Sequence, residues 1–215
     1  MVIVIHRVNE IAELKKIPAR YGVEIDVRGF GDKIFLNHDP IDDPFRCAEL
    51  QSYLKEFKHA FVIFYLKEAG YEMKVIGLAK KYNIENYFLL DVEFPFLYRA
   101  TRKEGFRKIA IRYSEEEPIE AVEKQIKRGK TLLDWVWIDT TTTLPLNERV
   151  IRKLKPFKTC LVCPDRWGRP LDILRYINKI KKLEFQLDAV MTSNTYIDVW
   201  ENSGTLKYIK RTSPS

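Results

Sequence analysis

The stretch from Val23 to Pro40 carries side chains that could bind a metal ion and transfer a proton. It begins as a strand, in which the alternation of side chains places Glu24, Asp26 and Arg28 on one face. A tight turn, GFGDK, then leads the chain back to His38. Two carboxylates can hold a divalent cation, and a nearby imidazole can act as an acid or a base. The same pattern also fits an edge hairpin whose charged face is only solvated.

The elements that must position these side chains follow a regular alternation of strand and helix. Eight strand patterns are expected at 1–5, 23–28, 61–67, 87–91, 108–113, 135–139, 159–165 and 187–193. Eight helical segments are expected at 9–22, 43–59, 72–83, 94–105, 118–129, 147–156, 171–182 and 198–210. This alternation predicts an α/β fold with a parallel sheet closed as a (β/α)₈ TIM barrel.

The residue at the carboxyl end of each predicted strand is polar. These residues are His6, Asp26, Lys67, Asp91, Arg112, Asp139, Asp165 and Thr192. Barrel enzymes build their active sites from these positions, which meet at one face. An open, doubly wound sheet would also collect polar strand ends, but its ligand would favour the switch point of the strand order. The pattern therefore favours the barrel and places the site at its mouth.

Composition limits the class of protein and of partner. The 215 residues are 46% hydrophobic, without a low-complexity segment, so we expect one domain over 1–215. The net charge of +7 favours an anionic partner, and a phosphate-bearing small molecule or lipid suits it better than nucleic acid, since no aromatic-basic motif occurs. No apolar run could span a bilayer and no signal peptide precedes the first strand, so a cytoplasmic protein is expected.

Two histidines at strand-like ends could act together. His6 and His38 could serve as base and acid in one reaction, since an imidazole titrates near neutral pH. The cations Arg7, Lys67 and Arg112 would surround them, as phosphoryl chemistry requires. Any one of these cations could instead pair with a neighbouring strand-end aspartate. His59, before a strand, is expected at the opposite, structural end.

The cysteines do not indicate a redox or zinc site. Cys160 and Cys163 have a CxxC spacing, but they lie in a strand pattern, where positions three apart face opposite ways. The sequence holds no second ligand pair, and Cys47 is far away in the chain. We therefore expect ordinary core packing.

Four motifs in order resemble those of a known enzyme family. HRVNE, VEID, HDP and YLKEAG are similar to the motifs of the glycerophosphodiester phosphodiesterases, a family of phospholipase-C-like phosphodiesterase barrels. Later segments such as NYFLLD, WVWID and CLVCPD look like those of a short branch of that group, so the resemblance covers nearly the whole chain. It implies a metal-dependent hydrolase that cleaves a glycerophosphodiester or a related phosphodiester with one Mg²⁺ or Ca²⁺.

The resemblance also implies roles for individual residues. His6 and His38 would be the acid/base pair, in an order left open. Arg7 and Lys67 would contact the phosphate, and Glu24 with Asp26 would bind the metal. In the implied reaction, a neighbouring hydroxyl group of the substrate attacks phosphorus, and a cyclic phosphate is the intermediate.

The chain departs from the family at two points. Tyr65 stands where the family has a third metal-binding Glu, so Asp91 is expected to be the third ligand, with Asp139 in reserve. The chain also lacks the lobe inserted after the HDP motif in larger members. We further expect Arg28, Arg112 and Asp139 to contact the substrate. Two other functions stay open: a non-catalytic barrel that binds a phosphorylated ligand, and a lyase of the sphingomyelinase D type that leaves a cyclic phosphate.

Overall fold

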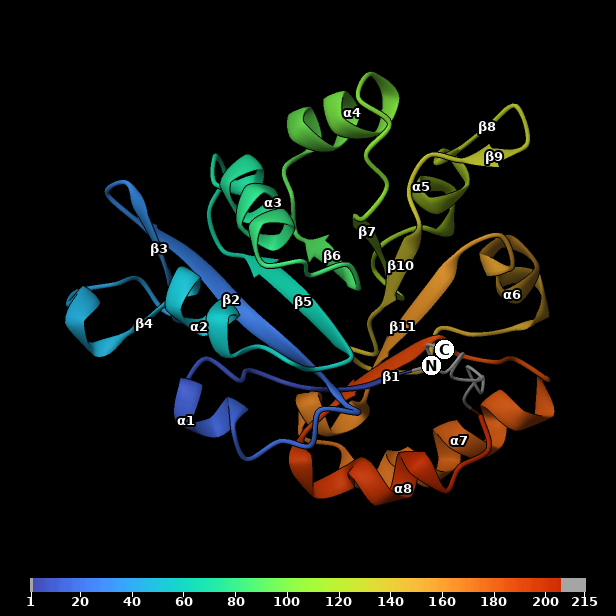
Figure 1. Ribbon diagram of the computed structural model, residues 1–215. Coiled ribbons are helices and arrows are strands. Elements are labelled where there is room, and N and C mark those ends of the chain that lie inside the picture. Colours follow the sequence, from blue (N-terminus) through green and yellow to red (C-terminus); the bar gives the residue numbers. More distant parts are fainter. Residues whose placement is uncertain (1, 206–215) are drawn as a thin grey trace, which may run out of the picture.

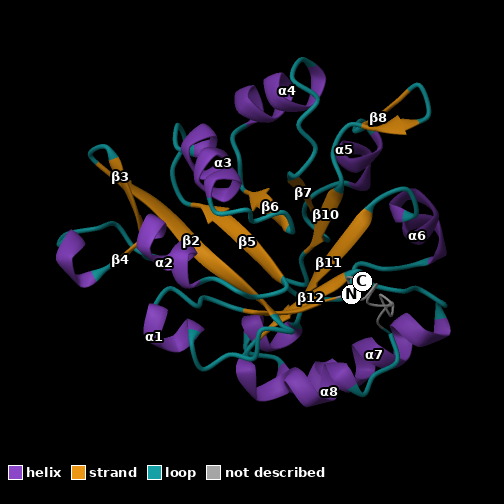
Figure 2. Ribbon diagram, in the orientation of Figure 1, coloured by secondary structure: helices purple, strands orange, loops and turns teal. Residues whose placement is uncertain are grey.

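The computed structural model describes residues 2–205, which form a mixed α/β fold with a central, largely parallel sheet (Figure 1). Helices lie around the outside and strands occupy the middle (Figure 2). The α/β class and the parallel sheet were expected from the alternating sequence pattern and are confirmed.

The parallel strands correspond one by one to the eight apolar runs of the sequence. They are β1 (Val2–Ile5), β2 (Gly22–Phe30), β5 (Phe61–Leu66), β6 (Tyr87–Leu90), β7 (Ala110–Tyr113), β10 (Trp135–Ile138), β11 (Lys158–Val162) and β12 (Ala189–Thr192). Parallel pairing runs in the order β7, β10, β11, β12, β1, β2, β5, β6. Between β6 and β7, one isolated parallel bridge joins Leu89 to Ile109. All these strands therefore end at the same side of the sheet.

An antiparallel extension carries the chain from β2 toward the site. β3 (Lys33–Leu36) folds back on β2 after a turn at Gly31, which has a φ of 60°. β4 (Ala48–Glu49) then pairs with β3. Leu36 lies opposite Val27, so the loop after β3 begins beside the end of β2. This register brings His38 close to the carboxyl ends of the parallel strands.

The helices are shorter than the sequence pattern predicted. They are α1 (Ile11–Leu14), α2 (Leu50–Glu56), α3 (Glu72–Lys81), α4 (Phe94–Arg102), α5 (Ile119–Glu123), α6 (Glu148–Leu154), α7 (Ile173–Lys182) and α8 (Ile197–Glu201). Pro18 disfavours helical backbone at the residue before it, which explains why α1 does not reach Gly22. The expected helix over 198–210 ends early, and its positions 206–210 lie outside the described residues.

Two expected helices contain other structure. The segment 43–59 holds a 3₁₀ turn, Pro44–Arg46, and β4 before α2 begins. The segment 118–129 holds α5 and then a hairpin of β8 (Ile126–Lys127) and β9 (Lys130–Thr131). Arg128 and Gly129 form its turn with φ values of 51° and 74°, and a two-residue hairpin turn of this kind requires positive φ at both positions.

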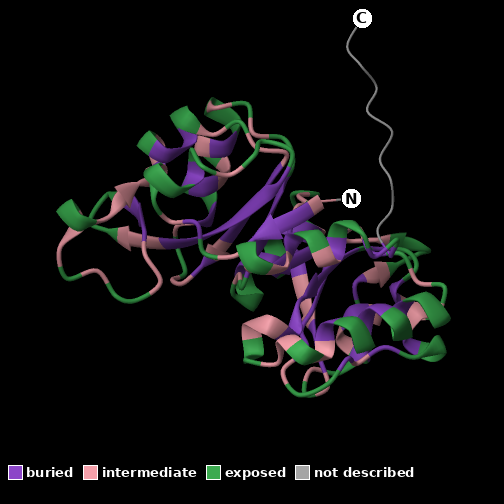
Figure 3. Cartoon of the chain, turned by 90° about the horizontal axis from the view of Figure 1, so that it is seen from below, coloured by how far each residue is buried: buried purple, intermediate pink, exposed green. Residues whose placement is uncertain are grey.

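The two faces of the sheet pack in separate clusters. Figure 3 shows that the strands are buried, whereas the helices around them have exposed outer surfaces. On β5, Val62 and Phe64 pack in the cluster that includes the helices, whereas Phe61 and Ile63 pack in a second cluster formed by strand residues alone. Phe61 contacts Trp135 there, with ring centroids 5.1 Å apart. Filling the space between the strands with large side chains holds the strand ends in fixed positions.

The cysteines behave as expected. Cys160 and Cys163 are both fully buried and free, and they lie in the two different core clusters, as their spacing in a strand predicts. Burial raises the pKa of both thiols. Within 2–205 no helix is long and apolar enough to cross a membrane.

Candidate active site

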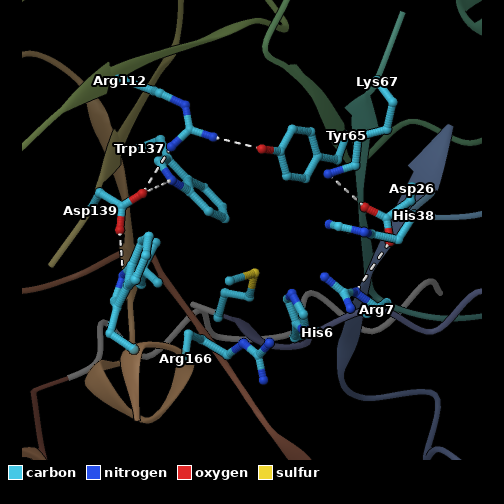
Figure 4. Close-up of a pocket in the computed structure, with 13 residues that line it drawn as sticks. His6, Arg7, Asp26, His38, Tyr65, Lys67, Arg112, Trp137, Asp139 and Arg166 are labelled. Atoms are coloured by element: carbon cyan, nitrogen blue, oxygen red, sulfur yellow. Dashed lines mark hydrogen bonds and ion pairs between the residues drawn. The ribbon is translucent and has the colours of Figure 1, made fainter. Parts of the chain in front are cut away.

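A cavity of about 440 Å³ lies at the carboxyl ends of the parallel strands (Figure 4). Its lining is rich in charged and aromatic side chains. The lining residues are His6, Arg7, Asp26, His38, Tyr65, Lys67, Arg112, Trp137, Asp139, Val162, Arg166, Trp167 and Met191. The volume suits a small polar ligand. The structure thus brings most of the predicted site residues, seven of ten, to one cavity, and leaves Glu24, Arg28 and Asp91 outside its lining.

Glu24 supports the first strand end from beneath. It lies on β2, is fully buried, and accepts a hydrogen bond of 2.8 Å from the backbone N–H of Arg7. Arg7 has a φ of 54°, a left-handed conformation that this contact helps to hold. The imidazole Nε2 of His6 lies 3.7 Å from Oε2 of Glu24. Glu24 therefore fixes the turn that presents His6 and Arg7 to the cavity.

Asp26 is the centre of a second polar cluster. Its carboxylate accepts from Asn9 Nδ2 at 2.9 Å and lies 3.0 Å from Lys67 Nζ and 3.6 Å from Arg7 Nε. Asn9 in turn accepts from the Asp26 backbone N–H at 2.9 Å. The side chain of Asp26 is only 1% exposed, so these three side chains take the place of water around its carboxylate. Sequence reasoning missed Asn9, although it stands in the HRVNE motif.

Burial changes the protonation of His6 and Glu24. Desolvation, helped by the positive charges of Arg166 and Arg7, lowers the pKa of His6 to about 3. Desolvation and the nearby Asp26 carboxylate raise the pKa of Glu24. His6 is therefore a neutral imidazole at neutral pH, with a lone pair free to accept a proton.

His38 is held differently and is more exposed. Its Nδ1 lies 2.8 Å from Oδ1 of Asp39, and its backbone carbonyl accepts from Arg28 at 2.9 and 3.1 Å. The hydrogen bond with His38 lowers the pKa of Asp39. Arg28 also pairs with Glu68 at 2.7 Å. Arg28 therefore braces the loop that carries His38 and is not part of the cavity lining, so its predicted contact with substrate stays a prediction.

Arg112 links the strand ends on the opposite wall. It donates to both oxygens of Asp91 at 2.6 and 2.8 Å, to Asp139 at 2.8 Å and to the hydroxyl of Tyr65 at 3.0 Å. Although burial opposes it, Asp91 raises the pKa of Arg112. Because two carboxylates already share its charge, Arg112 holds the wall together and has little charge left for a substrate.

Asp139 anchors two tryptophans to the same wall. It accepts from Trp137 Nε1 at 3.3 Å and from Trp167 Nε1 at 2.8 Å, in addition to Arg112. Trp137 is buried, whereas Trp167 is 45% exposed at the mouth of the cavity. These indoles were not predicted as site residues, because Trp137 reads as a strand core residue and Trp167 follows the strand end in a 3₁₀ helix, Pro164–Trp167.

Arg166 is a further residue of the site that the sequence did not reveal. It belongs to the same 3₁₀ helix, and Figure 4 shows its guanidinium beside His6. Its Nε is buried without a hydrogen-bond partner, and it makes no ion pair with any acid in the part of the chain that the structure describes. The available signal is the DRW sequence, in which Arg166 directly follows Asp165 at the end of the predicted strand 159–165.

The protein donors do not complete a site for a divalent cation. Glu24 and Asp26 lie together, and the buried Oε1 of Glu24 has no hydrogen-bond partner. However, no three His, Cys, Asp or Glu side chains among residues 2–205 are grouped so as to hold a metal. Asp91, the expected third ligand, is taken by Arg112, and Lys67 already contacts Asp26. Two carboxylates are too few for Ca²⁺, which takes six to eight oxygen ligands. Mg²⁺ needs only one or two carboxylates beside phosphate and water, but here it would have to displace the Lys67 ammonium group from Asp26.

Solved structures with the same fold are known. One is a glycerophosphodiester phosphodiesterase from Agrobacterium tumefaciens, with a TM-score of 0.62 and 15% identity, which covers 89% of this chain and 96% of the other. The chain shares its fold. A glycerophosphoryl diester phosphodiesterase from Parabacteroides distasonis has a TM-score of 0.57 and 13% identity, over 88% of this chain and 81% of the other. The resemblance noted in the sequence is thus confirmed at the level of the fold.

No protein-family model and no curated protein matches the chain.

Proposed function

We propose that this protein is a phosphodiester hydrolase that acts on a glycerophosphodiester or a related small or lipid-derived phosphodiester. The observation that carries the proposal is the placement of two histidines, His6 and His38, in one cavity with the cations Arg7 and Lys67. Two imidazoles supply a proton acceptor and a proton donor, and the cations stabilise charge on the phosphate. The fold shared with two phosphodiesterases supports this choice of chemistry.

The environments of the histidines favour a division of roles. His6 is neutral at neutral pH because of its burial, so it suits the base that takes a proton from a neighbouring hydroxyl of the substrate. That oxygen bonds to phosphorus as the bond to the leaving oxygen breaks. His38, whose ring Asp39 orients through Nδ1, gives a proton to the leaving alcohol. Water then opens the cyclic phosphate with the roles reversed, which makes the overall reaction a hydrolysis.

The parallel sheet supports a closed (β/α)₈ barrel as the frame for this chemistry. Seven neighbouring pairs of parallel strands form ladders, and the Leu89 to Ile109 bridge links the two remaining strands, β6 and β7. A backbone hydrogen bond of 2.9 Å from the Leu89 N–H to the Lys108 carbonyl lies at the same seam. A closed barrel would hold all the strand-end side chains around one mouth.

A pair of substrates tests the mechanism. Both are phosphodiesters that carry glycerol on one side of the phosphate, with ethanol on the other side in one substrate and p-nitrophenol in the other. Phosphorus NMR follows the product of the ethyl ester, and absorbance follows the release of p-nitrophenol. His6→Ala should lower turnover of both about 10²-fold to 10⁴-fold, since both need the base. His38→Ala should impair the ethyl ester similarly but spare the nitrophenyl ester, because nitrophenolate leaves without a proton.

His59 provides the matched control. It lies before β5, far from the strand ends, and its Nε2 is 2.9 Å from the Ile17 carbonyl. His59→Ala should therefore leave turnover of both esters unchanged when the protein is folded. Equal turnover of the ethyl ester by His38→Ala and wild type would rule out the proposed acid. Binding of phosphate esters without any turnover by wild type would identify a non-catalytic binding protein instead.

A further inference from the structure

Arg166 is a cation in the cavity that nothing in the described chain neutralises. Its side chain lines the pocket beside His6, and its buried Nε has no hydrogen-bond partner. A buried donor on a charged group is costly to leave unsatisfied. Arg112, another arginine that lines the cavity, is held by two carboxylates. Arg166 therefore has the free donors that an anionic ligand would satisfy.

Lys67 places a second positive charge where a metal ion could otherwise contact Asp26. Its Nζ lies 3.0 Å from Oδ1 of Asp26 and 3.2 Å from the ring centroid of Tyr65. The side chain is only 11% exposed, so the ammonium group is fixed between an acid and an aromatic face. An ammonium group in this position supplies charge next to the cavity without any added ion.

Tyr65 is the residue that separates this site from a three-carboxylate metal site. It stands at the position of the expected third acid, yet it supplies a ring face to Lys67 and accepts a hydrogen bond of 3.0 Å from Arg112. Both contacts position cations. A tyrosine here therefore replaces a metal ligand with a support for side-chain charges.

We propose that the phosphate of the substrate is held by the cationic side chains of Arg166, Lys67 and Arg7, and that no divalent cation takes part. This rests on the proposed phosphodiesterase function and specifies how its site supplies positive charge. Arg7 completes the group because it lines the cavity with 44% of its side chain exposed and only a 3.6 Å contact to Asp26. An arginine guanidinium can donate two hydrogen bonds to one phosphate, which suits Arg166 to the main contact.

Binding of inorganic phosphate in the presence of EDTA tests this without any need for turnover. Isothermal titration should show binding to wild type, and Arg166→Gln should weaken it about 10-fold to 100-fold, the range for a lost charged hydrogen bond. Arg175→Gln is the matched control, since this arginine is 67% exposed and pairs with Asp172 outside the cavity. It should bind phosphate like wild type. Phosphate binding by Arg166→Gln at wild-type strength would overturn the assignment.

Metal response gives the second test. Thermal unfolding of wild type should not shift with Mg²⁺ or Ca²⁺, whereas Tyr65→Glu, which restores a third carboxylate, should be stabilised by Ca²⁺. Wild type stabilised by Ca²⁺ as strongly as the variant would refute the proposal.

Turnover in EDTA then separates this inference from the proposed function. Hydrolysis of the glycerol phosphate esters that continues in EDTA supports both. Hydrolysis that appears only with Mg²⁺ or Ca²⁺ refutes the metal-free site and leaves the phosphodiesterase in place. Phosphate binding through Arg166 in EDTA, with no hydrolysis under any condition, refutes the enzyme and leaves the anion site in place.

Discussion

Replacing Asp139 with asparagine should destabilise the protein, because the NH₂ group of asparagine is a donor and would face hydrogen-bond donors. One oxygen of Asp139 accepts from Arg112 and Trp137, and the other accepts from Trp167 and the Thr140 backbone N–H. An asparagine has one oxygen and one NH₂ group in these places. Whichever way the amide is turned, its NH₂ group faces two donors, so two hydrogen bonds are lost.

The size of the effect follows from which donors are lost. Asp139 is only 6% exposed, so water cannot readily replace its contacts. A hydrogen bond to a charged group contributes about 1.5–3 kcal/mol and a neutral one about 0.5–1.5 kcal/mol. With either orientation of the amide, two hydrogen bonds to a charged carboxylate are lost, so Asp139→Asn should lower the free energy of unfolding by about 3–6 kcal/mol.

Asp91→Asn is the matched control, because Asp91 holds the same arginine from a more exposed position. Its side chain is 29% exposed, so water can solvate Arg112 after the change, and we expect a loss of about 1 kcal/mol or less. Urea unfolding followed by far-UV circular dichroism measures both variants. A loss for Asp139→Asn that is no larger than for Asp91→Asn would refute the idea that Asp139 is the buried anchor of this wall.

Two further results are expected from the buried titratable groups. In the native protein, an aromatic disulfide reagent should react readily with Cys47 alone. Cys160 and Cys163 should react only after unfolding, because both are fully buried. Fast reaction of two or three thiols in the native protein would contradict this packing. His6 has a lowered pKa in the folded state, so the unfolded state binds more protons between about pH 3 and 6.5 and stability should fall as the pH drops through this range. Wild type should therefore lose up to about 1.4 kcal/mol per pH unit more than His6→Gln, as urea unfolding at several pH values would show; parallel curves would contradict a neutral, buried His6.

The strands could be predicted from sequence because each is a short apolar run buried on both faces. The residues of such a run identify it as a strand without knowledge of its tertiary contacts. Cys160 and Cys163 also lie in the two different core clusters, as the alternation of side chains predicts. The hairpin at Arg128 and Gly129 could not be predicted in the same way. Its flanking residues have a helical pattern in the sequence, yet α5 ends at Glu123 and a turn with two positive φ values joins a short antiparallel pair.

A site residue could be predicted from sequence where its position at a strand end is enough to bring its side chain to the site. Asp26 and Lys67 meet because neighbouring parallel strands end side by side, which the strand order alone implies. Arg28 and Asp91 lie outside the cavity lining for the opposite reason. Each is on or next to a strand end, but each is paired with a charge from another part of the chain, Glu68 and Arg112. Sequence position does not reveal such pairing.

The availability of a charge, more than its presence, decides what this cavity can bind. Arg112 and Arg166 are both arginines at its wall, and sequence reasoning selected Arg112 because it ends a strand. Arg112 shares its charge with two carboxylates, whereas Arg166 has a buried donor without a partner. Since a charge already neutralised gains little from a second anion, the substrate phosphate should bind nearer Arg166 than Arg112. That position would be beside His6, the proposed base, and the rest of the substrate would then contact the wall of Trp137 and Trp167 that Arg112 stabilises.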